Sequence, residues 1–241
     1  MTAWLPFPAS AGLPLYCLPH AGGGASAFRG WLGEVPGVSV RPVQPPGRET
    51  RFREPPHDRM PTLVAGIADV VSTSGPYAVY GHSLGALVAF ELVRELRRRG
   101  EPLPVHLIVS GCAAPRYSAD DLPLVGGMTD GELVEMLRAL GGTPEWLLAD
   151  RSMLDMVLPA VRGDFSVKET YSYTEEPPLP VPLTVLASTG DPRAAHAAQQ
   201  AWAAETTADF TLHTLAGGHF AVFDHPTLTH KHLTEALHPH L

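Results

Sequence analysis

Cysteine is scarce in this sequence, because its 241 residues contain only two, Cys17 and Cys112. They are too few and too far apart for a disulfide framework or for a zinc site built from a CxxC pair. We therefore expect both to be small apolar residues of a protein that works in a reducing compartment.

Long apolar runs and an excess of positive charge are also missing. No uninterrupted stretch of about 18 apolar residues could span a membrane, and the first 12 residues lack the basic and apolar regions of a signal peptide. Seventeen Lys and Arg residues stand against 25 Asp and Glu residues, and the net charge of -8 argues against a broad basic face for nucleic acid. The sequence thus predicts a cytoplasmic protein that binds neither membranes nor nucleic acid.

The composition is that of an ordinary globular domain, with 44% hydrophobic and 17% charged residues. Short β-branched or apolar runs alternate with helical patterns, as in parallel strands joined by crossover helices. The fold class is therefore predicted to be α/β, in a single domain over residues 1–241. Six strands are expected, at Leu13–Leu18, 38–43, 77–80, 105–110, 183–187 and Phe210–Leu215. A seventh strand before these six is allowed.

The clearest helix is predicted at residues 86–99. Apolar side chains form a wide face there, three arginines lie in the last turn, and Gly100 supplies the stop. Weaker helical patterns cover residues 61–74, 194–206 and Pro226–Leu237, with proline near the first turn in the first and last of these.

About seventy residues separate the fourth and fifth expected strands, much more than one crossover helix needs. We place a helical insertion at residues 115–173. Thr129 and Glu132 form a capping-box pattern before its first helix, and further helices are expected after Pro144 and Ser152. The insertion is rich in methionine and other apolar residues. Two interpretations stay open: helices that pack on one another and on the core, or a lid that lines a hydrophobic acyl channel.

The most informative string is residues 77–85, where a predicted strand runs through Gly-His-Ser-Leu-Gly directly into a predicted helix. This is the context of a nucleophile elbow, a tight turn that exposes a serine hydroxyl beside a helix N-terminus. The flanking glycines avoid clashes with the strand and the helix. We predict Ser83 as the nucleophile. Neighbouring side chains on such a turn point apart, so His82 is interpreted as a packing or hydrogen-bonding residue.

A serine nucleophile needs a histidine base that is held by a carboxylate. Among twelve histidines, His219 follows the last predicted strand in a glycine-rich loop that can return over the sheet edge, and His225 is the second candidate. Asp191 lies between the serine and the histidine in chain order, in a Gly-Asp-Pro turn at a strand end, where Pro192 disfavours helix. An Asx turn without a catalytic part is the alternative for Asp191.

Acyl transfer also needs two backbone N–H donors for the tetrahedral oxyanion. One is expected at Leu84, directly after the nucleophile. The other should come from the glycine-rich loop after the first strand, residues 19–25. That loop lacks the GK[ST] ending of a P-loop and the GxGxxG spacing of a dinucleotide site, so nucleotide binding is weakly supported.

Five motifs in this order resemble those of the stand-alone type II thioesterases of polyketide and nonribosomal peptide biosynthesis. They are Leu-Pro-His-Ala-Gly-Gly (18–23), Gln-Pro-Pro-Gly-Arg-Glu (44–49), Gly-His-Ser-Leu-Gly-Ala (81–86), Gly-Asp-Pro (190–192) and Gly-Gly-His-Phe (217–220). The resemblance covers nearly the whole chain. It implies an α/β-hydrolase fold, a mostly parallel central sheet flanked by helices, with a helical lid at residues 115–173. The Gly-Asp-Pro turn looks shorter than is usual in that family.

The resemblance also implies an activity, the hydrolysis of acyl groups from the phosphopantetheine thiol of acyl carrier or peptidyl carrier proteins, which clears stalled or mis-primed units. Position by position, Ser83 matches the family's nucleophile, Asp191 its acid and His219 its base. Ala21 and Leu84 match the backbone donors of the oxyanion hole. The resemblance implies no metal and no bound cofactor, and we expect a monomer.

Two other functions stay open. Malonyl transacylases also carry Gly-His-Ser-Leu-Gly, in a different fold and with a serine–histidine pair, so an acyltransferase with another acceptor is one alternative. A non-catalytic acyl-carrier binding protein is the other, and the complete set of triad residues argues against it. For docking, Arg48, Arg51, Arg53 and Arg59 form a local basic cluster that could meet an acidic carrier protein, unless they are an ordinary solvated loop.

Overall fold

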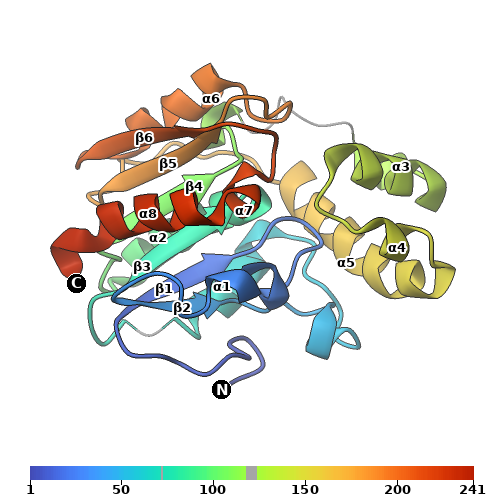
Figure 1. The fold of residues 1–241 in the computed structure, drawn as a ribbon, viewed down its shortest axis with the longest axis horizontal. Coiled ribbons are helices and arrows are strands. Elements are labelled where there is room, and N and C mark those ends of the chain that lie inside the picture. Colours follow the sequence, from blue (N-terminus) through green and yellow to red (C-terminus); the bar gives the residue numbers. More distant parts are fainter. Residues whose placement is uncertain (72, 118–123) are drawn as a thin grey trace.

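A parallel sheet flanked by helices forms the centre of the computed structural model, which describes residues 1–71, 73–117 and 124–241 (Figure 1). Within these residues, six strands run parallel in the order β2-β1-β3-β4-β5-β6. The strands are β1 Leu13–Leu18, β2 Val38–Pro42, β3 Ala78–His82, β4 His106–Ser110, β5 Leu183–Ser188 and β6 Phe210–Leu215. All six predicted strands are present, and the seventh that was allowed before them is absent from residues 1–12.

The helices follow the predicted pattern with adjusted ends. The α-helices are α1 Met60–Ala68, α2 Leu84–Arg99, α3 Asp130–Leu140, α4 Glu145–Leu148, α5 Arg151–Glu169, α6 His196–Gln200, α7 Ala221–Asp224 and α8 Pro226–Leu237. The 3₁₀ helices are η1 Ala25–Trp31, η2 Glu49–Arg51, η3 Pro115–Tyr117, η4 Val125–Gly127, η5 Ala201–Glu205 and η6 His238–His240. None of the helices in the described part of the chain combines the length and apolarity needed to cross a membrane.

Two predicted helices differ from the observed ones. The pattern at residues 61–74 ends early, at Ala68, because the β-branched and hydroxyl-bearing residues that follow it have low helix propensity. The helix expected over residues 194–206 begins at His196 and changes to a 3₁₀ helix at Ala201. The helix α8 has the predicted bounds, with Pro226 at its first position.

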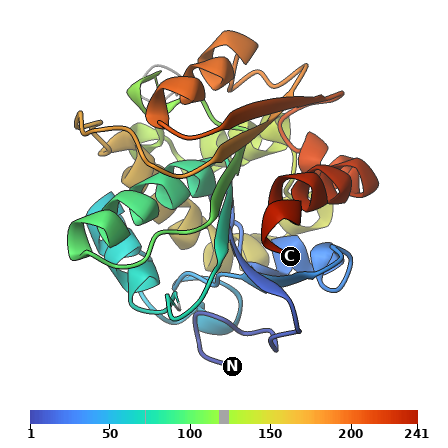
Figure 2. The ribbon, with the colours of Figure 1, turned by 90° about the vertical axis from the view of Figure 1, so that its left-hand side faces the viewer.

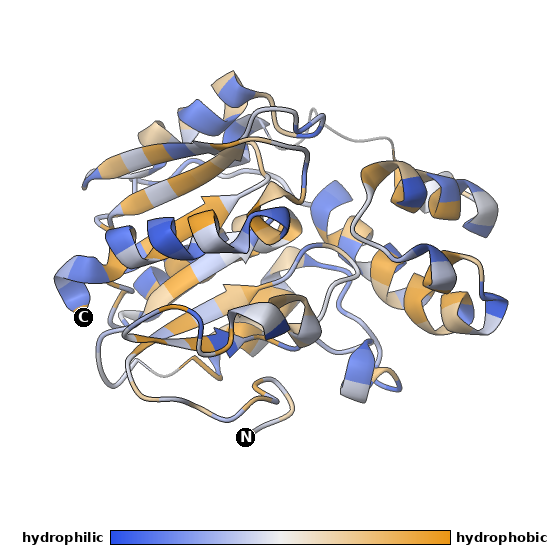
Figure 3. Cartoon of the chain, in the orientation of Figure 1, coloured by the Kyte–Doolittle hydropathy of each residue, from blue (hydrophilic) through white to orange (hydrophobic). Residues whose placement is uncertain are grey.

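Helices cover both faces of the sheet, which Figure 2 shows from the side. Alternate side chains along a strand point to opposite faces. In β4, Leu107 and Val109 belong to the apolar cluster that includes α1 and α2, whereas Ile108 belongs to the cluster that includes η1 and α8. The inner strands β3, β4 and β5 are buried along their whole length because both faces are covered. The edge strand β6 instead alternates apolar and polar residues, which appear as orange and paler or blue bands in Figure 3.

The helices α3, α4 and α5 come between β4 and β5 in chain order and form the predicted insertion (Figure 1). Residues 118–123 of this insertion lie outside the described residues. The predicted capping box is present, and the Glu132 carboxylate accepts from the Thr129 N–H at 2.8 Å. The helix expected after Ser152 begins one residue before it, because the Asp150 carboxylate caps its first turn. These helices share an apolar cluster of their own, so they pack on one another.

The loops at the carboxyl ends of four strands carry the predicted site residues. Ala21 follows β1, Ser83 follows β3, Asp191 follows β5 and His219 follows β6. The strand order reverses between β1 and β3, because the chain passes outward from β1 to β2 and then in the other direction from β3 to β6. Parallel sheets bind ligands in the crevice at such a reversal. The topology therefore places Ala21 and Ser83 on the two sides of that crevice.

Candidate active site

The turn between β3 and α2 holds Ser83 in a strained conformation, with φ at 56° and ψ at -120°. A Cβ on Gly81 would lie 2.1 Å from the Gly85 carbonyl oxygen, and one on Gly85 would lie 2.2 Å from that of Leu18. Glycine is therefore required at both positions. The Ser83 N–H donates to the Ser110 carbonyl at 2.8 Å, which ties the turn to the end of β4.

His219 connects Ser83 to Asp191 through two hydrogen bonds. Its Nε2 lies 3.0 Å from Ser83 Oγ, and its Nδ1 lies 2.8 Å from Asp191 Oδ2. When Nδ1–H donates to the carboxylate, Nε2 keeps its lone pair toward the serine hydroxyl and can accept its proton. The other Asp191 oxygen accepts the Arg193 N–H at 2.8 Å, so the carboxylate makes the Asx-type contact as well. His225, the second candidate for the base, is exposed where α7 meets α8.

Two further imidazoles, those of His20 and His82, lie near His219. The ring of His82 is 5.0 Å from that of His219, and its Nδ1 is 2.9 Å from the Ser110 hydroxyl, as expected of a packing and hydrogen-bonding residue. Burial, and then the charge of His219, lowers the pKa of His82 well below its ordinary value, and the same causes lower the pKa of His20 to about 4. Both rings are thus neutral near pH 7. His219 alone among the three has a carboxylate to stabilise its positive charge.

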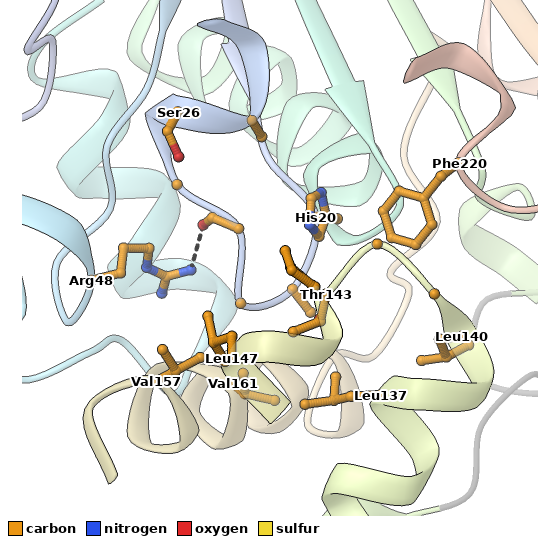
Figure 4. Close-up of a pocket in the computed structure, with 18 of the residues that line it drawn as sticks. His20, Ser26, Arg48, Leu137, Leu140, Thr143, Leu147, Val157, Val161 and Phe220 are labelled. Carbon is orange, nitrogen blue, oxygen red and sulfur yellow. Dashed lines mark hydrogen bonds between the residues drawn. The ribbon is translucent and has the colours of Figure 1, made fainter. Parts of the chain in front are cut away.

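A cavity of about 830 Å³ lies beside these residues (Figure 4). Its walls come from the glycine-rich loop after β1, from the helices α3 to α5 and from the loop that carries His219. Apolar side chains of the insertion lining it include Leu137, Leu140, Leu147, Val157 and Val161. The insertion helices therefore pack on one another and also line a largely apolar cavity.

A second, smaller cavity is lined by Ser83, Ala21, Leu84 and His219 together. Leu84 is the first residue of α2, where an N–H has no partner within the helix. In residues 1–71, 73–117 and 124–241, the amides of Ala21 and Leu84 donate to no other protein group. Both amides therefore lack a protein acceptor and belong to residues that line the same cavity as Ser83.

The turn between α3 and α4 contacts the loop that carries His219. A Cβ on Gly142 would lie 2.2 Å from Cζ of Phe220, so the ring of Phe220 occupies the space that a side chain would need. That ring packs edge-on against His20 at 5.0 Å and against His219 at 5.1 Å. The insertion thus reaches the neighbour of the predicted base.

Two of the four arginines of the basic cluster suggested for docking are engaged in ion pairs. Arg48 is 6% exposed and forms a two-pronged ion pair with Asp164 of α5. Arg51 is paired with a glutamate three positions away, whereas Arg53 and Arg59 are exposed. The interpretation of the cluster as one docking surface was therefore wrong for Arg48, whose partner is 116 positions away and left no signal in the local sequence.

One group of side chains in the described part of the chain could offer three ligand atoms to a metal ion, namely His213, His232 and Glu235. It lies on β6 and α8, and none of the three residues lines either cavity beside Ser83. The two imidazoles are stacked, with centroids 4.0 Å apart and planes 17° apart, so their in-plane lone pairs do not converge on one point. The arrangement is that of a stacked pair with a hydrogen bond from His232 to Glu235.

Comparisons with known proteins agree on one family. The model of the thioesterase domain matches residues 13–238. The gramicidin S biosynthesis protein GrsT of Aneurinibacillus migulanus is 37% identical over 220 residues, which cover 89% of this chain and 85% of GrsT. The structure of RedJ, a thioesterase from the prodiginine biosynthetic pathway in Streptomyces coelicolor, has a TM-score of 0.85 at 38% identity, over 96% of this chain and 91% of RedJ. The type II thioesterase BorB from the borrelidin biosynthetic cluster has a TM-score of 0.87 at 36% identity, over 98% of each chain.

Proposed function

The chain belongs to the thioesterase family, among the type II thioesterases of polyketide and nonribosomal peptide pathways, and on that premise we propose that Ser83, His219 and Asp191 hydrolyse acyl thioesters on the phosphopantetheine of carrier proteins. The observation that carries the proposal is the pair of hydrogen bonds that joins Ser83 through His219 to the buried Asp191. The proposed role is editing, in which the enzyme removes stalled or mis-primed acyl units from acyl carrier or peptidyl carrier proteins.

The first half of the reaction forms an acyl-enzyme. Nε2 of His219 takes the proton of Ser83 Oγ while this oxygen attacks the thioester carbonyl carbon. The carbonyl oxygen becomes an oxyanion, which the amides of Ala21 and Leu84 stabilise. Asp191 stabilises the imidazolium. The tetrahedral intermediate then loses the pantetheine sulfur, which leaves as a thiol with the proton from His219.

The second half of the reaction releases the acid. Water gives a proton to Nε2 of His219 and attacks the ester carbonyl of acyl-Ser83. The same two amides stabilise the second oxyanion, and Ser83 leaves with the proton returned by His219. The free acid departs. No metal or bound cofactor takes part in this proposal, because the phosphopantetheine belongs to the partner protein.

We assign the cavity of about 830 Å³ to the acyl group. Its size lies within the range of about 300–1,000 Å³ that is usual for small-molecule sites, and apolar side chains of α3, α4 and α5 line one side of it. In this proposal those helices act as a lid over the acyl-enzyme and limit the access of bulk water.

The experiment that tests the proposal follows the intact mass of an acyl-loaded carrier protein with the wild type and with Ser83→Ala, over short and long acyl groups. We expect the acyl mass to disappear and the free acid to form with the wild type only. Persistence of the acyl mass with both proteins contradicts the proposal. Movement of the acyl group to another acceptor, without free acid, supports the acyltransferase alternative, although the parallel sheet is not the fold of malonyl transacylases.

A fluorophosphonate probe gives an independent readout. A serine activated by a histidine and a carboxylate reacts covalently with such a probe. We expect labelling of the wild type and none of Ser83→Ala. A folded wild-type sample that does not react contradicts the triad and supports the non-catalytic binding protein.

A further inference from the structure

We propose that Arg48 and Asp164 are positioning residues, which fix the Ala21 amide in the direction that an oxyanion on the substrate requires. This inference rests on the proposed function of Ser83. The two residues lie outside the triad, in the segment after β2 and in α5. Their ion pair contacts peptide groups of the glycine-rich loop (residues 19–25) that supplies the Ala21 amide.

The ion pair is buried and makes contacts on two sides. The Arg48 and Asp164 side chains are 6% and 5% exposed, and Arg48 Nη2 lies 2.8 Å from Asp164 Oδ1. Asp164 Oδ2 also accepts the Gly22 N–H at 2.7 Å. Arg48 Nη1 also donates to the Gly23 carbonyl at 3.0 Å, the dashed line in Figure 4. Each partner of the pair thus holds one peptide group of the glycine-rich loop.

The rigidity of the peptide plane converts these contacts into a direction for the Ala21 N–H. That N–H belongs to the same peptide as the His20 carbonyl, which accepts the Gly23 N–H at 2.9 Å. The next peptide contains the Gly22 N–H that Asp164 holds. The peptides on both sides of Ala21 are therefore fixed, and its N–H points opposite to the His20 carbonyl.

Neighbours of Arg48 hold the following part of the chain. Gln44 Oε1 accepts the Ala25 N–H at 2.8 Å, and Glu49 Oε1 accepts the Ser26 N–H at 3.1 Å. Glu49 does so with φ at 47°, a strained conformation for a residue with a side chain. The motif at residues 44–49, which has no part in the proposed bond-making steps, thus has a physical role in holding the glycine-rich loop.

The helix α5 contacts the glycine-rich loop directly as well. Gly22 has φ at +76°, and a Cβ there would lie 2.8 Å from Cγ2 of Val161, one turn before Asp164. The helix that lines the acyl cavity through Val157 and Val161 therefore also sets the backbone that carries the Ala21 amide. A buried ion pair adds little net stability over an apolar pair of similar volume, which fits a role in positioning.

The test replaces Asp164 by Asn, which keeps the shape of the side chain and removes its charge. Asp130→Asn is the matched control. Asp130 is the exposed first residue of α3 and pairs at 2.7 Å with Arg162 of α5, the helix that also carries Asp164, without contact with the glycine-rich loop. The readouts are kcat and KM on a short acyl thioester of N-acetylcysteamine. A third readout is the inhibition constant of an alkyl trifluoromethyl ketone, whose hemiketal adduct with serine carries an oxyanion.

Loss of an entire oxyanion donor typically lowers kcat by about 10²–10³-fold. A donor that is only displaced should lower kcat by a smaller factor. We expect Asp164→Asn to lower kcat by about 10–100-fold and to weaken trifluoromethyl ketone binding by a similar factor, with KM changed less than about threefold. Arg48→Lys, which keeps the charge and loses the two-pronged geometry, should give a smaller loss in the same two readouts. Asp130→Asn should match the wild type.

A folded Asp164→Asn variant with wild-type kcat, or one with a raised KM alone, overturns the proposal. If this variant does not fold, Arg48→Lys decides by the same two readouts. Ser83→Ala, measured beside them, separates the two proposals. Hydrolysis that survives Ser83→Ala contradicts the proposed function and with it the premise of the positioning role. Hydrolysis that depends on Ser83 but not on Asp164 or Arg48 overturns the positioning role alone.

Discussion

Replacing Asp191 by Asn should remove most of the activity, because both carboxylate oxygens already accept a hydrogen bond. One accepts from His219 Nδ1 and the other from the Arg193 N–H, each at 2.8 Å. Asparagine offers one oxygen and one NH₂ group. If the NH₂ group faces Arg193, two donors oppose each other. If it faces His219, Nδ1 must accept, and Nε2 then carries its proton toward Ser83 and cannot act as the base.

The size of the effect follows from the cost of each orientation. A buried N–H without an acceptor costs about 1–3 kcal/mol, so the orientation with the wrong histidine tautomer is favoured. In a serine triad that error lowers kcat by about 10⁴, which corresponds to about 5 kcal/mol of barrier. Asp191 lines neither cavity beside Ser83. We therefore expect kcat to fall by about 10³–10⁴ while KM stays close to that of the wild type.

The assay measures thiol release from an acyl-loaded carrier protein, with a thermal melt of each variant to verify folding. Asp209→Asn is the matched control, because Asp209 is exposed and precedes β6, at the end of the strand away from the site. It should behave as the wild type. A folded Asp191→Asn enzyme that keeps more than about a tenth of the Ser83-dependent kcat would refute the reasoning.

Three further predictions concern the insertion, the pH dependence and the cavity. Gly142→Ala should lower kcat/KM more than Gly141→Ala in steady-state kinetics. Both glycines have positive φ, and Gly141, with φ at 75° and ψ at -172°, has a conformation that costs other residues about 1–3 kcal/mol. Only a Cβ on Gly142 meets Phe220, and equal effects would contradict this contact. Burial lowers the pKa of His106 to about 4, so the unfolded chain binds the proton first. The contribution of His106 to the free energy of unfolding is therefore fully present above about pH 6.5, and about 3 kcal/mol of it is lost as the pH falls toward 4. Urea unfolding of His106→Gln should show a smaller loss of the free energy of unfolding between about pH 6.5 and pH 4. A loss equal to that of the wild type would argue against His106 as its cause. Val157→Phe should narrow the cavity and lower kcat/KM for long acyl groups relative to acetyl, and an unchanged ratio would place the acyl chain elsewhere.

Ser83 and His219 could be predicted because short sequences determine their surroundings. The glycines at positions 81 and 85 are a direct consequence of backbone contacts near 2 Å, and a strand before them and a helix after them are recognisable locally. The Gly-Gly-His-Phe segment likewise follows a strand that was predicted with its observed bounds. Asp191 could be predicted only from its place in chain order between the serine and the histidine. Its hydrogen bond with His219 is visible only in the three-dimensional structure. The catalytic roles of these residues remain predictions.

Arg48 could not be interpreted correctly from the sequence. Four arginines within twelve positions look like a basic surface, and no periodic pattern connects one of them to an aspartate in a helix of the insertion. Burial of a charged pair depends on packing between distant segments, which a local pattern does not contain. The early end of α1 was also missed, because Val70 and Val71 continue the apolar pattern although the chain has already turned.

The position of Asp164 limits how acyl selectivity could be engineered by exchanging parts between relatives. A chimera that received its entire insertion from another enzyme would keep Arg48 and could lose the acid that neutralises it. A buried charge without its partner costs about 3–5 kcal/mol, and the Gly22 amide would lose its acceptor at the same time. A graft should therefore take α3, α4 and the first turns of α5, and should leave the native chain in place from Leu158 onward.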